Sequence, residues 1–567
     1  MDSEKRNLML AVAASIAIMV GFHFFYDKPR LEQAVQEQQG KTATVVAPAT
    51  EILPMPQPVV VEAENTSQDA RISIETPTLK GSLNLRGGRI DDLILKSYKE
   101  TTDATSPDVT LLAPKGNQKA YYCDFGWVSA QTGLTLPSSQ TMWSAPIDTK
   151  LTPETPLVLT WTSPEGVLFE RHISVDDNYM FYIKDRVKNK SAQPLSLAFY
   201  ALISRSSPDV ASTSYALHEG MVGYLAGSLE ETKFKDLDDS AKKSFQSTGG
   251  WLGITESKYW LAAILPDQKE NIVANYRSVG TEQDPKFQAD FLAPAKILQS
   301  GAETEETFRF FAGPKSVEIL DTYEVKEGVP HFDLAVDFGW FYFITKPLFF
   351  VLKWLYNLCG NLGIAIILLT LLIRLLMFPL ANKSFKSMAK MKSIQPELAR
   401  IKEECGDDKM KFNQEMMAFY KREKVNPVSG CLPMVLQIPV FFAIYKVLLI
   451  SIEMRHAPFF GWIHDLSAPD YTTIFNLFGL IPWAPPSFLM IGALPLLMGL
   501  TMFLQQKMNP QPVDPIQAKM FLVMPILFTY MLAQFPAGLV LYWTCTNIFS
   551  MAQQWVMTDF IPSMRKK

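Results

Sequence analysis

A single arginine interrupts the long apolar stretch from Asn361 to Asn382. The stretch is long enough to cross a bilayer. A guanidinium stays charged at any reachable pH, and placing it in hydrocarbon costs about 2.5–3.5 kcal/mol on insertion scales. A helix that leaves the membrane near Asn382 would put Arg374 about 12 Å inside, at 1.5 Å per residue. An arginine nearer the helix end would snorkel to the headgroups. The depth favours instead an inward-facing arginine in a wet cavity.

Other polar side chains fall at a similar predicted depth in the neighbouring apolar runs. They are Gln437, Asn547, Thr370 and Thr501. One interpretation is that such groups only hold helices together, at about 0.6 kcal/mol each. That interpretation explains a coincident arginine less well. A polar layer around one fixed positive charge, with apolar residues in the outer half of the bilayer, predicts a cavity open to the cytoplasm. Such a cavity would attract acidic or polar segments.

Six apolar runs are candidate membrane spans. The first, within residues 1–27, ends without the small residues of a cleavage site, which favours an uncleaved anchor over a cleaved signal peptide. The second is 359–382, and four more occupy 429–558 (429–450, 487–507, 519–535 and 537–556). Lys and Arg gather in 383–428, in the Lys507–Lys519 loop and in the tail 559–567. The positive-inside rule therefore places both termini in the cytoplasm.

A soluble region separates the first two spans. Residues 28–68 are rich in Pro, Gln, Ala, Val and Glu, which predicts a flexible linker. Residues 69–330 carry short alternating segments such as Phe169–Val175, and this period of two predicts a large periplasmic antiparallel β-sandwich. Such a domain could be a carbohydrate enzyme, but no pair of carboxylates stands out. Solvated sheet faces account for most of its acidic residues.

Two further segments flank the second span. Residues 331–358 predict an amphipathic interfacial helix that carries Lys346 and Lys353 on one face. Residues 383–428 predict a cytoplasmic helical hairpin, because its first 42 residues hold eleven Lys/Arg and seven Asp/Glu with two helical apolar patterns. The glycine and aspartates of Cys405–Asp408 separate the two helices. Methionines on the hairpin (Met388, Met391 and Met416) offer an adaptable surface for apolar segments, although packing between the two helices explains them equally well.

Composition excludes several classes of protein. The net charge of −4 and the lack of a long basic tract give no indication of nucleic-acid binding. The five cysteines show no metal-ligand spacing, and no glycine loop of the phosphate-binding kind is present. The sequence therefore predicts no metal, no cofactor and no enzymatic active site. Together these patterns predict a polytopic α-helical membrane protein with six transmembrane helices and a large periplasmic β-sandwich.

Motifs along the helical half resemble the YidC/Oxa/Alb family of membrane protein insertases. The matching segments are Thr370–Arg374 with Pro379, Ser387–Met391 with Gln395-Pro396, Gly406–Asp408, Asn426-Pro427, Gly430–Pro433, Gln437–Pro439, Trp462–Leu466 and Phe535–Trp543. The sandwich adds Asn84–Gly88, so the resemblance extends over nearly the whole chain and is strongest to Gram-negative members. One segment of the outer loop, Gly479–Pro486, is longer than in some relatives and has no assigned role.

The resemblance implies a fold and a function. The family has a conserved five-helix core, and its members insert hydrophobic segments into the bacterial inner membrane and help them fold, alone or with the Sec translocon. Their clients are nascent membrane proteins that arrive from ribosomes or through the signal recognition particle pathway. By this resemblance Arg374 is the groove arginine, and Thr370, Gln437, Phe441, Tyr542 and Trp543 line the client path. The hairpin would make early contact with the client, and the mutarotase-like sandwich would carry no activity.

Two other functions remain open at this point. A secondary transporter predicts inverted repeats and a midplane site, and neither is visible in the sequence. A periplasmic sensor or envelope enzyme would use the sandwich as its working part.

Overall fold

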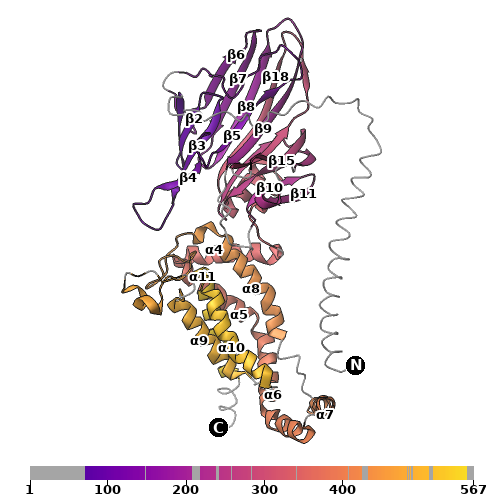
Figure 1. The fold of residues 1–567 in the computed structure, drawn as a ribbon, viewed down its shortest axis with the longest axis vertical. Coiled ribbons are helices and arrows are strands. Elements are labelled where there is room, and N and C mark those ends of the chain that lie inside the picture. Colours follow the sequence, from indigo (N-terminus) through magenta and orange to yellow (C-terminus); the bar gives the residue numbers. More distant parts are fainter. Residues whose placement is uncertain are drawn as a thin grey trace.

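A computed structural model describes residues 70–557, apart from 147–148, 207–217, 238–241, 257, 282–283, 340, 407, 424–431, 482, 484, 487–489 and 510–514. The predicted anchor (1–27), the linker (28–68) and the tail (559–567) lie outside the described residues. A β-sandwich and a helical region occupy opposite ends of the long axis of the molecule (Figure 1).

Two antiparallel sheets form the sandwich. The strands of the first sheet are β1 (Arg71–Glu75), β2 (Leu79–Asn84), β3 (Arg89–Lys99), β4 (Asp108–Leu112), β5 (Tyr121–Val128), β9 (Leu195–Ser206), β12 (Lys242–Thr248), β15 (Asn271–Thr281), β16 (Asp284–Leu292) and β17 (Lys296–Leu298). They follow the order β1–β2–β3–β5–β9–β16–β15–β12, with β4 on β3 and β17 on β9. The strands of the second sheet are β6 (Leu157–Thr162), β7 (Val167–Val175), β8 (Met180–Asn189), β10 (Gly220–Leu225), β11 (Ser228–Lys233), β13 (Trp251–Glu256), β14 (Trp260–Pro266) and β18 (Glu303–Pro314). Their order is β11–β10–β13–β14–β18–β8–β7–β6.

The alternating pattern of the strands places one face of each sheet in the core. Along β7, buried residues such as Phe169 and Ile173 alternate with part-exposed residues such as Glu170 and His172. The buried side chains of both sheets meet in one hydrophobic core. The predicted antiparallel sandwich is therefore confirmed.

The helical region follows the last strand. Its elements are α3 (Val317–Glu327), η4 (Phe332–Ala335), α4 (Tyr342–Cys359), α5 (Leu362–Leu376), α6 (Phe378–Cys405), α7 (Lys409–Arg422), α8 (Leu432–Ile450), η6 (Ile452–Met454), η7 (Ile474–Gly479), α9 (Ala493–Met508), α10 (Pro515–Leu532) and α11 (Ala537–Trp555). Helix α5 packs on α4 and α11, α9 packs on α10 and α11, and α8 packs on α4. Among the described residues, no single helix is both long and apolar enough to cross a bilayer, whereas α5 and α6 together qualify across a 61° bend. The count of six spans stays a prediction.

The bend between α5 and α6 changes the predicted position of Arg374. Helix α5 ends at Leu376 and α6 begins at Phe378, so Arg374 lies in the last turn of α5. Pro379 sits in the first turn of α6, where it lacks an N–H and cannot continue the hydrogen bonds of α5. The 12 Å depth assumed one straight helix to Asn382, and that assumption is wrong. A cation in a last turn also complements the partial negative charge of the helix C-terminus.

The charged segment after α5 folds as two helices, α6 and α7. Helix α6 ends at Cys405, and the following Gly406 adopts φ +56°. The Asp408 carboxylate accepts hydrogen bonds from the backbone N–H groups of Met410 and Lys411 at the start of α7. The glycine and the aspartate thus separate the helices at the residues where the sequence predicts the break.

Ion pairs connect α3, η4 and the residues just after η4 to α4 and α8. Their partners are Lys346 with Asp321 (2.9 Å) and Asp333 (2.7 Å), Lys353 with Glu318, and Lys446 with Asp337 (2.7 Å). Burial raises the pKa of Asp333, but hydrogen bonds from Lys346 and Tyr342 outweigh it and leave that pKa below its ordinary value. The two lysines that share one face of α4 therefore bind α3 and η4, and Lys446 has a carboxylate partner.

Candidate functional site

The predicted site centres on Arg374, which is half-buried at the end of α5. Its guanidinium lies close enough to the Tyr542 hydroxyl for the two groups to interact electrostatically. Among the residues that the structure describes, Arg374 has no carboxylate partner and no hydrogen bond. A half-buried charge without a counter-ion is costly unless water or a bound acidic group satisfies it.

Tyr542, which interacts electrostatically with this arginine, belongs to a polar pair between two other helices. Gln437 on α8 donates a hydrogen bond from Nε2 to the Tyr542 hydroxyl on α11, at 3.0 Å. Tyr542 is 3% exposed. The structure therefore brings together three of the predicted residues, Arg374, Gln437 and Tyr542, from α5, α8 and α11. A cation and an amide in a partly buried setting can bind a carboxylate or a backbone carbonyl.

Aromatic rings lie next to the polar group on α8 and α11. Phe441 and Trp543 make an edge-to-face contact with centroids 4.8 Å apart. Three aromatic residues that the sequence reasoning did not assign to the client path extend the cluster: Phe528, Tyr445 and Phe535. The spacing of Phe441 and Tyr445 by one helical turn was a usable signal for the second of these.

The remaining predicted groove residues are engaged in helix contacts. Asn547 on α11 donates a hydrogen bond to the Thr501 hydroxyl on α9 at 3.2 Å, and both residues are buried. Thr370 is 1% exposed and donates to the Ile366 carbonyl of its own helix at 2.7 Å. These contacts match the interpretation of polar residues that hold helices together. The predicted layer therefore divides into one group near Arg374 and a separate pair between α9 and α11.

The methionines predicted as a client-contact surface on the hairpin are neither fully buried nor fully exposed. Met388, Met391 and Met416 are all part-buried. The most exposed methionines of the hairpin are Met410 (55%) and Met417 (52%), both on α7. Solvent therefore reaches α7 methionines that the pattern of apolar positions did not indicate.

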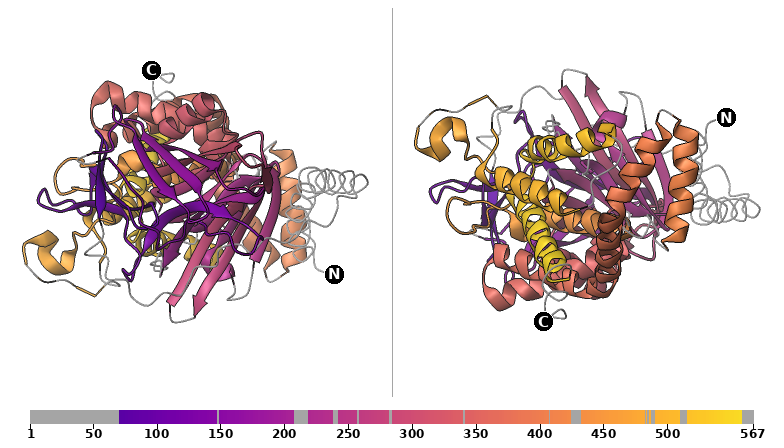
Figure 2. Two further views of the ribbon diagram at one scale, coloured as in Figure 1. Left: turned by 90° about the horizontal axis from the view of Figure 1, so that it is seen from above. Right: turned by 90° about the horizontal axis from the view of Figure 1, so that it is seen from below.

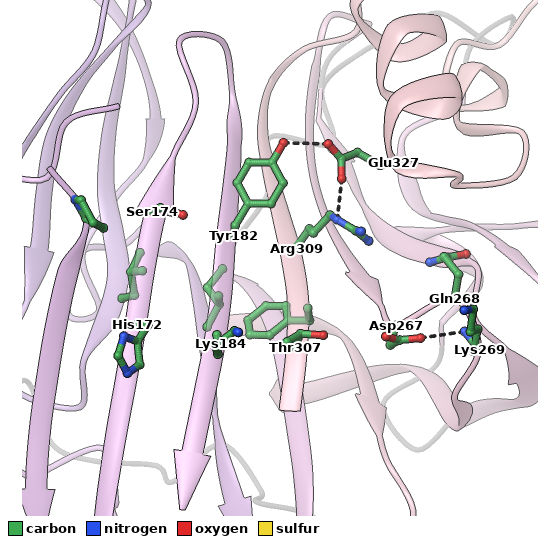
Figure 3. A pocket seen from close by; sticks show the side chains of 14 residues that line it. His172, Ser174, Tyr182, Lys184, Asp267, Gln268, Lys269, Thr307, Arg309 and Glu327 are labelled. Carbon is green, nitrogen blue, oxygen red and sulfur yellow. Dashed lines mark hydrogen bonds and ion pairs between the residues drawn. The ribbon is translucent and has the colours of Figure 1, made fainter. Parts of the chain in front are cut away.

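A cavity of about 680 Å³ lies on the solvent face of the second sheet. Figure 3 shows its lining side chains on β7, β8 and β18, with His172, Lys184 and Thr307 on neighbouring strands. Glu327 accepts hydrogen bonds from Tyr182 and pairs with Arg309, each at 2.8 Å. Its carboxylate is thus already satisfied.

One cluster has the composition of a metal site. Ligand atoms of Glu324, His331 and Asp333 lie within 4.8 Å of one another. Asp333, however, already accepts hydrogen bonds from Lys346 and Tyr342. Burial, with the charge of Asp333 second, raises the pKa of Glu324. The Asp333 carboxylate is thus already paired with a lysine, and the raised pKa of Glu324 favours its protonated form. The cluster is therefore an ion-pair site rather than a set of ligands for a cation.

Two family models together match most of the chain. The model described as "YidC periplasmic domain" matches residues 71–351, and the one described as "60Kd inner membrane protein" matches residues 354–565.

Curated relatives match over nearly the full length. A "Membrane protein insertase YidC" of Beijerinckia indica is 47% identical, covering 98% of this chain and 96% of the relative. A protein of the same name from Rickettsia rickettsii is 45% identical, covering 99% of this chain and 100% of the relative. A solved structure described as "Active YidC insertase crystal structure with the first transmembrane domain resolved" is 16% identical. It covers 85% of this chain and 91% of its own chain, with a TM-score of 0.35.

Proposed function

The chain belongs to the YidC family of membrane protein insertases, and we propose that it inserts client segments through a polar site built around Arg374. It is an insertase rather than an enzyme, with a periplasmic domain ahead of its helical region. The polar site, the topology and the partners below are our proposals.

The observation that carries the site proposal is the charge of Arg374 beside the Gln437–Tyr542 hydrogen bond. The guanidinium has no carboxylate partner among the described residues, although intramembrane cations usually pair or face water. A client segment with an acidic or polar end supplies such a partner. The site therefore suits transient binding of the part of a client that must cross the membrane.

In the proposed mechanism, two parts of the client move along different surfaces. Its polar outer segment enters a cavity open to the cytoplasm and to lipid, and is held near Arg374. Its apolar segment slides between α8 and α11, past Phe441 and Trp543, into the bilayer. Transfer of that segment into hydrocarbon supplies the driving force, at about 0.8 kcal/mol per buried CH₂ group.

The proposed topology has six spans, with the N-terminal anchor as the first and both termini in the cytoplasm. The α6–α7 hairpin is then cytoplasmic, and Met388, Met391 and Met416 make early contact with the client. Nascent membrane proteins arrive from ribosomes or through the signal recognition particle pathway. The chain inserts them alone or beside the Sec translocon.

Purified protein in sealed liposomes tests the site. The client is a short single-span protein with an acidic outer tail, and protection of that tail from added protease reports insertion. We expect the parent to insert it without nucleotide, Arg374→Ala to lose most insertion and Arg374→Lys to retain it. Arg400→Ala is the matched control, because Arg400 lies on α6 with its side chain 73% exposed.

Two results would contradict the proposal. Full insertion by Arg374→Ala would show that the arginine is not needed for client binding. A parent that protects no more client than empty liposomes would refute autonomous insertion. Solute uptake by the same liposomes would then support the transporter alternative. Within the site, Gln437→Leu and Tyr542→Phe should reduce insertion by similar factors, and the double variant by little more, because both remove one hydrogen bond.

A further inference from the structure

The outer connection between α8 and α9 carries an apolar segment that the proposed site does not use. Residues 471–481, called here the outer tip, lie on η7 and its flanks. Six large apolar side chains of this tip are exposed: Tyr471 (63%), Phe475 (42%), Leu477 (53%), Phe478 (53%), Leu480 (83%) and Ile481 (44%). In both views of Figure 2 this amber segment projects beyond the outline of the helices. An exposed apolar cluster of this density marks a binding surface.

Hydrogen bonds hold the tip in one conformation. Thr473 and Asn476 form a reciprocal capping box, and the backbone N–H of Phe478 donates to the Thr473 carbonyl at 2.7 Å. Leu477 and Phe478 adopt φ values of +48° and +58°, which are unfavourable for residues with a side chain. The structure thus maintains a strained backbone that points apolar groups outward, as is typical of functional sites.

The tip is fixed to the first turn of α9. The Asp470 carboxylate accepts hydrogen bonds from the Leu494 backbone N–H at 2.8 Å and from the Trp462 indole at 3.3 Å. The Thr472 hydroxyl accepts one from the Ala493 backbone N–H at 3.1 Å. These hydrogen bonds connect the start of the tip to the start of α9.

Composition and continuity identify the occupant of this surface. No charged residue occurs from Tyr471 to Gln506. On α9, the exposed residues before the last turn are all leucines and continue the surface: Leu496, Leu497, Leu500 and Leu504. The exposed Lys507 follows in the last turn, at the far end of the helix. The tip lies in the part of the helical region nearer the sandwich, below α4 in the view of Figure 1. Helix α4 exposes further rings there, including Phe343 (71%) and Trp354 (61%). Aromatic side chains are enriched at membrane–water interfaces, and Trp, Phe and Leu form the face that interfacial segments bury at the boundary of headgroups and acyl chains.

We propose that the outer tip inserts into the outer leaflet of the bilayer, at the boundary of headgroups and acyl chains. It rests on the proposed function in one respect, the placement of the 451–492 connection on the outer side. As an interfacial anchor, the tip fixes the height of α9 in the membrane. Helix α4 makes a second contact at the same boundary.

Fluorescence quenching in nanodiscs that hold one copy of the full chain tests the proposal. The native cysteines are replaced, and an environment-sensitive label is placed by Leu480→Cys or, separately, Phe478→Cys. Ile297→Cys is the matched control, because Ile297 on β17 of the sandwich is an aliphatic residue 73% exposed. The discs contain phosphatidylethanolamine and phosphatidylglycerol, with a doxyl quencher high on the acyl chain or iodide in the buffer.

We expect doxyl lipid to quench the labels at 480 and 478 several-fold more than the label at 297, and iodide to show the reverse order. Equal iodide access at all three positions would overturn the proposal. Shielding that appears only when a client is added would assign the tip to client binding instead, and shielding only at high protein density in liposomes would assign it to a second copy. Client insertion is measured with the same labelled proteins. Full insertion with an iodide-accessible label would refute the anchor alone, whereas a lipid-buried label without insertion would refute the proposed function alone.

Discussion

A buried arginine joins the two sheets of the sandwich, and its removal should be costly. Arg171 on β7 is 1% exposed, and its Nε lies 2.8 Å from the Asp185 carboxylate on β8. Its Nη2 donates to the Phe125 carbonyl on β5 at 2.8 Å, and its Nη1 donates to the Gly88 carbonyl at 3.1 Å. The guanidinium also lies over the rings of Phe125 and Trp143, 4.0 and 4.5 Å from their centroids.

Arg171→Met leaves Asp185 as an uncompensated buried carboxylate. The hydrogen bond from the Trp127 indole to Asp185 at 3.2 Å would remain. Breaking a buried pair in this way costs about 3–5 kcal/mol, which is a large share of the 5–15 kcal/mol typical of a whole domain. The double variant Arg171→Met with Asp185→Leu removes both charges, so we expect it to recover most of the loss.

Urea unfolding of the full chain in detergent, followed by tryptophan fluorescence, measures these changes. Arg186→Met is the matched control, because Arg186 on β8 is 33% exposed and pairs with Glu305 at the surface. Exposed pairs of this kind contribute about 0–1 kcal/mol. A loss for Arg171→Met no greater than that for Arg186→Met would refute the reasoning, as would a double variant less stable than the single one.

Three further predictions concern separate parts of the chain. At the α9–α10 contact, a Cβ added at Gly499 would lie 2.1 Å from the Thr529 hydroxyl oxygen. Gly499→Ala should therefore destabilise the helices by about 1–3 kcal/mol, and Gly499→Ala with Thr529→Ala by less, in thermal unfolding monitored by circular dichroism. Burial lowers the pKa of His218 to about 4, below its ordinary value of 6.5. The folded protein therefore holds the imidazole neutral, and the contribution of His218 to the free energy of unfolding is fully present above pH 6.5. Stability should then fall by up to about 3 kcal/mol between pH 6.5 and 4, and His218→Gln should flatten that part of the profile. Asp408→Ala removes the cap of α7 and should raise proteolysis of the hairpin, with a cost of about 0.5–2 kcal/mol.

Local patterns in the sequence predict the elements better than their partners. The strands can be predicted from the sequence because solvent covers one face of each sheet. On β7, for example, Glu170 and His172 alternate with buried neighbours. The break in the hairpin can be predicted because Gly406 adopts a positive φ after α6 and Asp408 caps the N-terminus of α7. Few other residue types favour these two positions. Pro379 also signalled the end of α5, but the apolar residues after it supported a longer helix.

Contacts between distant segments depend on how each helix is rotated, which a nearly uniform apolar run does not record. Gln437 and Tyr542 are 105 residues apart, and no local signal indicates that they share a hydrogen bond. Depth alone grouped Asn547 with Arg374, whereas Asn547 bonds to Thr501 on α9. Depth also grouped Gln437 with Arg374, and Tyr542 was added to the same site only through the resemblance to the family.

The ion pairs around α4 predict that the helical region can insert clients without the sandwich. Within the described part of the chain, the carboxylates that form ion pairs with Lys346, Lys353 and Lys446 are those of Glu318, Asp321, Asp333 and Asp337. Deletion of residues 71–310 therefore removes the strands up to the middle of β18 but keeps all of these pairs with α4 and α8. It also exposes apolar residues of α3, such as Leu320 and Tyr323, which lowers solubility.

We expect the deleted chain to insert the single-span client within a few-fold of the parent, because the groups proposed to bind the client are retained. Helical circular dichroism and resistance of the helical region to protease establish that the remainder is folded. A folded remainder that inserts nothing would make the sandwich the working part, as the sensor and envelope-enzyme alternatives require. A third outcome is possible: the deleted chain inserts the client, but loses this activity when Lys346→Met and Lys446→Met are added. That result would identify residues 318–337 as the segment that holds α4 and α8 in position.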